Sequence, residues 1–75
     1  MQELVAVIAR ALVDHPEAVV TTAKEDEHHI SVELHVAEDD MGKVIGRQGR
    51  IAKAIRTVVK AAAVRTNKRV TVEII

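Results

Sequence analysis

All three glycines of this 75-residue chain lie within the eight residues GKVIGRQG, from 42 to 49. Glycine is favoured where the backbone needs a positive φ, or where another backbone or a ligand comes very close. The tightest backbone turns are therefore expected in this one stretch. The cluster predicts either a plain turn between two elements or a surface on which the backbone of a ligand rests.

Hydrophobic periodicity predicts the elements on either side of this turn. Apolar residues at helical spacing mark a first helix that stops before Pro16, and runs of β-branched or alternating residues mark three strands. Asp39 or Asp40 is expected to cap a short helical turn that leads into the glycines. The order is α-β-β-α-α-β, over residues 2–13, 17–24, 30–36, 41–45, 50–65 and 69–75. This order predicts one α+β domain that spans residues 1–75.

The helix predicted from 50 to 65 carries two stripes of side chains. The apolar stripe consists of Ile51, Ile55, Val58, Val59 and Ala62, and the basic side chains opposite are Lys53, Arg56 and Lys60. A basic stripe is most often a solvated helix face, and contact with a nucleic acid is the alternative for Arg56 and Lys60. Lys53 lies one turn from the glycines, so we expect it at a ligand.

Charge divides the chain into two halves, although the net charge is zero. Residues 1–40 contain ten acidic and two basic side chains, whereas residues 41–72 contain nine basic side chains and no acidic one. This asymmetry indicates an anionic partner for the second half. The alternative is that the two halves neutralise each other through ion pairs in the fold.

Several classes of function do not fit the sequence. A Walker A loop and a dinucleotide-binding turn both need other spacings than those of Gly42, Gly46 and Gly49. No nucleophile is paired with a base, and His28, His29 and His35 lack the spacing of a recognised metal site. The sequence thus predicts a non-enzymatic domain without cofactor, metal or small-molecule substrate. It has no signal peptide or membrane span, so a cytoplasmic location is expected.

The residues Gly46-Arg47-Gln48-Gly49 stand between two predicted helices. Two glycines let a loop run close to a sugar-phosphate backbone, and the free N–H groups that open the second helix favour an anion. Basic side chains at Lys43, Arg47, Arg50 and Lys53 add positive charge nearby. This loop is therefore predicted to bind the phosphates of a nucleic acid, whether RNA or single-stranded DNA.

The run VIGRQGRIAKAIR resembles the VIGxxGxxIxxI signature of KH RNA-binding domains, and the chain as a whole resembles the small bacterial KH-domain protein A (KhpA) family. The resemblance implies a type II KH fold, with a three-stranded mixed sheet and helices on one face. It also implies that the loop clamps about four nucleotides of a single strand. Bases would rest on a cleft formed by Val44, Ile45, Ile51 and the apolar residues of 30–36. Since the chain has no Phe, Tyr or Trp, these contacts would be aliphatic.

A second seam of side chains runs along the long helix. It consists of Ala54, Val58, Ala61 and Arg65. Small residues allow two helices to approach closely, so the seam predicts a dimer interface, and high helix propensity is the alternative reason for the alanines. The family resemblance implies a homodimer and pairing with a larger, multi-domain KH protein of the KhpB type.

The sequence as a whole predicts a non-catalytic domain that binds single-stranded RNA and, as the resemblance implies, acts as an RNA chaperone or post-transcriptional regulator. The alternative is a dimerisation module that uses a KH fold and binds little RNA. The acid-free stretch 41–72 favours RNA binding, because an interaction module has no need of nine uncompensated basic residues there.

Overall fold

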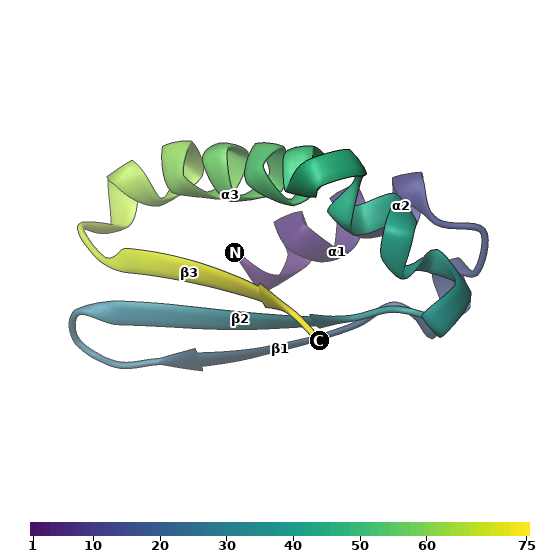
Figure 1. The fold of residues 1–75 in the computed structure, drawn as a ribbon. Coiled ribbons are helices and arrows are strands. Elements are labelled where there is room, and N and C mark those ends of the chain that lie inside the picture. The colour runs from purple at the N-terminus through teal and green to yellow at the C-terminus, as the bar shows by residue number, and fades with distance from the viewer.

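The computed structural model describes all 75 residues and has the predicted order of elements. The three α-helices lie on one side of the sheet, and the other side of the sheet is open (Figure 1). The α+β class and the α-β-β-α-α-β order are thus confirmed. The elements are α1 (Gln2–Leu12), β1 (Val20–Glu25), β2 (His29–His35), α2 (Met41–Ile45), α3 (Arg50–Ala63) and β3 (Arg69–Ile74).

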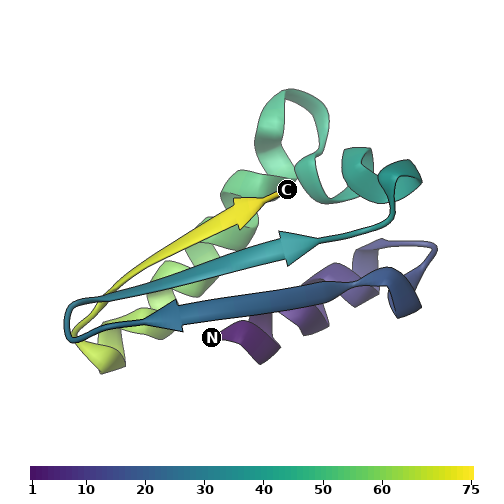
Figure 2. The same cartoon turned by 90° about the horizontal axis from the view of Figure 1, so that it is seen from below.

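The sheet is mixed, and its strands stand in the order β1-β2-β3. β1 and β2 form an antiparallel hairpin, whereas β2 and β3 are parallel, with Ile30 opposite Val70 and Val32 opposite Val72. Parallel strands need a long crossover, which α2 and α3 supply. Figure 2 shows this sheet from its open side, with β3 at one edge and β1 at the other.

An aliphatic core fills the space between the sheet and the helices. The alternation predicted for β2 is confirmed, because Ile30, Val32 and Leu34 are buried while their neighbours along the strand are half-exposed. The other core side chains come from every layer: Val5 and Ala9 of α1, Val44 of α2, Ile55, Val59 and Ala63 of α3, Val70 and Val72 of β3, and Val19. No helix is both long and apolar enough to cross a bilayer.

The structure corrects two details of the predicted elements, which are the first residue of β1 and the buried face of α3. The strand expected from residue 17 begins at Val20, because Pro16–Ala18 form a 3₁₀ turn in which the Val19 N–H donates to the Pro16 carbonyl at 3.1 Å. On α3 the buried face is Ala52, Ile55, Val59 and Ala63. The prediction that Val58 belongs to this face was wrong, since its side chain is 48% exposed. Successive helical residues point about 100° apart, so Val58 cannot share the direction of Val59.

Candidate nucleic-acid interface

The glycine turn connects α2 to α3 through three residues of positive φ. Gly46, Gln48 and Gly49 have φ values of 75°, 58° and 74°. The Gly49 N–H donates to the Gly46 carbonyl at 3.1 Å and closes the turn. Arg47 and Gln48 form its exposed tip. The backbone thus makes a tight, outward-facing loop, as the sequence predicts.

The two glycines at the ends of this loop have different surroundings. A Cβ on Gly46 would lie 2.6 Å from Ile51 Cγ1 and 2.9 Å from the Ile51 backbone nitrogen, so a side chain there would collide with α3. A Cβ on Gly49 would meet nothing within 4 Å. Gly46 therefore serves the packing of the loop against α3, and the space beside Gly49 is open to a ligand.

Helix α3 begins directly after Gly49, and its first turn has no acidic side chain. The first N–H groups of a helix have no partner within it and carry the positive end of its dipole. Arg47, Arg50 and Lys53 are exposed around this end. The loop and the start of α3 therefore form one positively charged surface.

Most of the basic side chains in residues 41–72 have no acidic partner. Only Lys43 and Lys68 lie within ion-pair distance of a carboxylate. The other seven are Arg47, Arg50, Lys53, Arg56, Lys60, Arg65 and Arg69. Neutralisation inside the fold, the alternative to an anionic partner, accounts for two of the nine positive charges.

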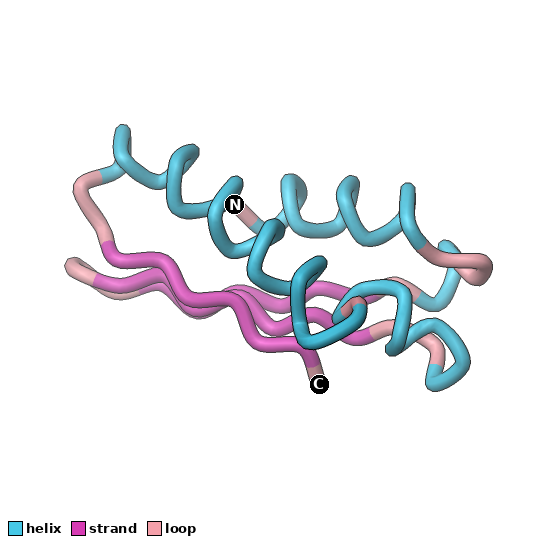
Figure 3. Tube along the Cα trace, turned by 45° about the horizontal axis from the view of Figure 1, so that its top comes forward, coloured by secondary structure: helices cyan, strands magenta, loops and turns pink.

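A groove of about 660 Å³ runs between α3 and the edge strand β3. Figure 3 shows the two elements side by side, with the turn between α2 and α3 near one end. The α3 wall carries Lys53, Arg56, Thr57 and Lys60, and the β3 wall is the segment 70–73. Arg56 Nε donates to the Val72 carbonyl at 3.3 Å, across the groove. The basic stripe of α3 therefore lines a groove, which the helical pattern alone does not reveal because β3 is distant in sequence.

Only two of the apolar residues that were predicted to form a cleft for bases are accessible to a ligand. Val44 has no exposed surface and packs in the core, so the prediction that it contacts a base is corrected. The same correction holds for Ile30, Val32 and Leu34, whose side chains point toward the helices. Ile45 is 36% exposed and Ile51 half-buried, so both remain accessible beside the loop.

Lys43 lies on α2, and its ammonium donates to the carboxylate of Asp14, which follows α1. This hydrogen bond lowers the pKa of Asp14 below its ordinary value and raises the pKa of Lys43 above its own. Both groups are exposed, so bulk water screens the pair. A phosphate at Lys43 would have to displace Asp14.

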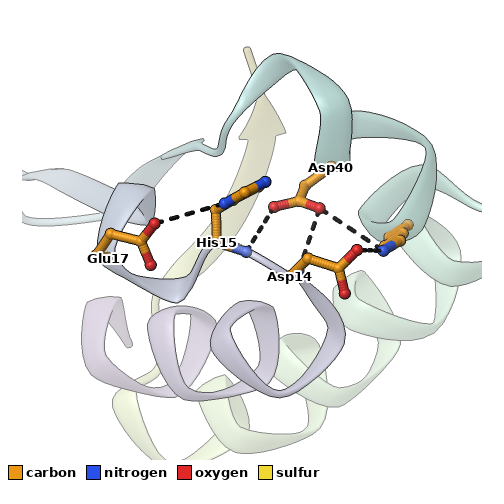
Figure 4. A network of polar contacts seen from close by, with 5 residues as sticks. Asp14, His15, Glu17 and Asp40 are labelled. Atoms are coloured by element: carbon orange, nitrogen blue, oxygen red, sulfur yellow. Dashed lines mark hydrogen bonds and ion pairs between the residues drawn. The ribbon is translucent and has the colours of Figure 1, made fainter.

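Asp40 ties the chain after α1 to the start of α2, as Figure 4 shows. Its carboxylate is 1% exposed and accepts the backbone N–H groups of Asp14, at 3.2 Å, and His15, at 2.9 Å. Lys43 Nζ lies 3.9 Å from the same carboxylate. Asp40 is the N-cap residue of α2, one of the two positions that the sequence predicts, but its side chain makes no capping hydrogen bond because its oxygens face another segment.

The predicted dimer seam is a solvent-facing strip of α3 that continues into the 3₁₀ turn Val64–Thr66, since α3 ends at Ala63 and not at Arg65 as the sequence predicts. Ala54, Val58, Ala61 and Arg65 are all exposed, and Val64 beside them is 75% exposed. This strip contributes nothing to the buried face of α3, which lies on the sheet.

Comparison with known proteins gives matches along the whole chain. The family model for the KhpA/KhpB KH domain matches residues 2–74. The chain is 63% identical to the RNA-binding protein KhpA of Clostridium perfringens over the full length of both. It is 51% identical to the RNA-binding protein KhpA of Listeria monocytogenes, over 100% of this chain and 99% of that one.

A solved structure shares the fold at low sequence identity. The crystal structure of Era in complex with MgGDPNP and nucleotides 1506-1542 of 16S ribosomal RNA aligns with a TM-score of 0.72 and 20% identity. The alignment covers 97% of this chain and 28% of the Era chain, so the likeness concerns one part of that larger protein. With the family match over residues 2–74 and full-length relatives above 60% identity, the chain belongs to the KhpA/KhpB KH-domain family.

Proposed function

We propose that the chain binds single-stranded RNA, without catalysis, through the loop Gly46 to Gly49 and the groove between α3 and β3. The observation that carries this proposal is the run of unpaired cations that starts at the open loop and continues along the groove wall. Its relatives are named RNA-binding proteins. In the cell it would act as an RNA chaperone or a post-transcriptional regulator.

The loop would hold the RNA backbone, and the groove would take the bases. One phosphate would lie beside Gly49, where a Cβ would meet no atom within 4 Å and the positive end of the α3 dipole is close. Arg47, Arg50 and Lys53 would contact adjacent phosphates. The bases nearest the loop would pack on Ile45 and Ile51 beside it, and the following bases would lie in the groove. Without aromatic stacking each base forgoes roughly 1–3 kcal/mol. We therefore expect modest affinity and a strong dependence on salt.

The proposal predicts that the double variant Arg47→Asp, Gln48→Asp loses RNA binding. Two carboxylates at the loop tip repel phosphates, and aspartate tolerates the left-handed backbone of residue 48, so the fold should survive. Fluorescence anisotropy of a labelled single-stranded RNA pool across a salt series measures the effect. For the native protein we expect a log-log salt slope of about −2 to −3, as for three or four single-strand phosphates.

A matched control separates loop contacts from overall charge. Arg10→Asp with Ala11→Asp makes the same charge change on exposed positions of α1, away from the groove. Circular dichroism must first show that both variants fold. If the native protein does not bind at low salt, or if both variants bind as it does, the loop is not an RNA clamp and the dimerisation module becomes the better explanation.

We also propose self-association through the strip Ala54, Val58, Ala61 and Arg65, with a larger KhpB-type protein as a second possible partner. The exposure of Val58 and Val64 supports this proposal, because apolar side chains on a helix surface are commonly covered by a partner. Ala61→Asp is expected to convert a dimer to a monomer in size-exclusion chromatography at micromolar concentration. Thr57→Asp, on the groove side of the same helix, should leave the dimer intact. A native protein that elutes as a monomer contradicts the proposal.

A further inference from the structure

A second hollow lies at the end of the molecule opposite the glycine loop. It has a volume of about 490 Å³ and is lined by His28, His29, Arg69 and Thr71. Figure 1 shows that the β1–β2 hairpin and the connection from α3 to β3 meet at this end. Thr71 lines this hollow and also the groove between α3 and β3. The two depressions therefore adjoin around the edge of β3.

The side chains of the hollow suit an anion. Arg69 is exposed and has no carboxylate within ion-pair distance. His29 Nε2 lies 3.0 Å from Thr71 Oγ1, so a ring nitrogen and a hydroxyl stand together beside the guanidinium. In the sheet register Lys24, Ser31 and Thr71 form one row across the three strands, which places a further cation and hydroxyl on the same open face.

Two of the three acidic side chains of the β1–β2 hairpin end are already engaged, and the third, Glu27, is exposed and has no ion-pair partner. The Glu25 carboxylate pairs with Lys68. Asp26 accepts the backbone N–H groups of His28, at 2.8 Å, and His29, at 2.7 Å, and these bonds lower its pKa. Neither carboxylate is paired with Arg69, whose guanidinium stays available to a ligand.

Further along the open face the charge changes sign. Glu33 and Glu73 are register partners on adjacent strands, two residues beyond Ser31 and Thr71. Neither has an ion-pair partner, so both repel a phosphate on the open face, and Glu73 does the same at the β3 wall of the groove, opposite the cations of α3. On the open face of the sheet, the region that favours a phosphate is therefore limited to the end beside the β1–β2 hairpin.

We propose that this hollow is a second phosphate subsite, which receives the backbone of the RNA strand after it leaves the groove between α3 and β3. This inference rests on the proposed function. The 14 residues of α3 separate the loop from the hollow by about 20 Å, at 1.5 Å per residue. A KH loop clamps about four nucleotides, so a tetranucleotide would occupy the loop and the groove without reaching the hollow. A longer RNA would reach the hollow.

The test compares Arg69→Gln with the native protein on two probes, a tetranucleotide and a dodecanucleotide of uridine. Binding is followed by amide NMR titration and fluorescence anisotropy across a salt series. We expect Arg69→Gln to bind the longer RNA about threefold more weakly, with a salt slope less steep by about 0.7, and the shorter RNA unchanged. In the native protein the amide signals of Arg69 and Thr71 should move only with the longer RNA. Arg10→Gln, a like change on α1, should alter neither probe.

The possible outcomes separate the two proposals. If the native protein binds neither probe, the proposed RNA binding fails and the subsite with it. If the native protein binds both probes through the loop, but Arg69→Gln equals the native protein on the longer RNA, the subsite is wrong and the loop proposal stands. An equal loss on both probes also overturns the subsite, because Arg69 would then act on the clamp itself.

Discussion

Gly46→Ala is expected to lower the free energy of unfolding by about 2–6 kcal/mol. A non-glycine residue at φ 75° and ψ 172°, a backbone region essentially restricted to glycine, costs about 1–3 kcal/mol. The new methyl group would also lie 2.9 Å from the Ile51 backbone nitrogen, and overpacking of this kind costs about 1–3 kcal/mol more. The free energy of unfolding of a domain of this size is roughly 4–11 kcal/mol in total, so the variant would lose a large share of its stability.

The other two glycines supply matched controls for this prediction. Gly49→Ala places alanine in the left-handed helical region, at φ 74° and ψ 16°, with open space around its methyl group, and should cost about 1–2 kcal/mol. Gly42→Ala lies in α2 with open space around it, so it should be neutral or stabilising by up to about 1 kcal/mol. Urea unfolding followed by circular dichroism gives all three values. Equal costs for Gly46→Ala and Gly49→Ala would mean that the contact with Ile51 is not what requires glycine.

This difference among the glycines marks where sequence reasoning stops. Their clustering predicted a tight turn, because glycine is the residue that adopts positive φ without strain. Which glycine cannot be replaced for reasons of packing depends on Ile51, which lies against Gly46 in the first turn of α3. That contact belongs to the three-dimensional arrangement and has no local signal in the sequence.

Periodicity predicted the elements well, since each strand and helix buries one face. The alternation of Ile30, Val32 and Leu34 in β2 is an example. The predictions failed where they required knowing which part of the fold an apolar residue or a strand packs against. Val44 was expected beside a ligand, and it packs in the core. The groove wall at 70–73 was missed, because only the fold places β3 next to α3.

Asp40→Ala is expected to lower the free energy of unfolding by about 2–4 kcal/mol. The buried carboxylate accepts the backbone N–H groups of Asp14 and His15, and its loss leaves two donors without a protein partner. Hydrogen bonds to a charged group are worth about 1.5–3 kcal/mol each, and water that reaches the half-buried donors recovers part of this. Urea unfolding measures the total cost.

The neighbouring Asp39 is the natural control, because the sequence predicts either aspartate as the cap of α2 and only Asp40 is buried. Asp39→Ala should change stability by less than about 0.5 kcal/mol, as exposed substitutions usually do. Asp40→Asn keeps the size and one acceptor oxygen but turns an N–H₂ toward a donor, so it should cost about half as much as alanine. In amide NMR, the Asp14 and His15 signals should move in both Asp40 variants and stay in place in Asp39→Ala. Equal, small costs at both positions would mean that the carboxylate of Asp40 does not hold the end of α1 to α2, and that the loop is positioned by apolar packing alone.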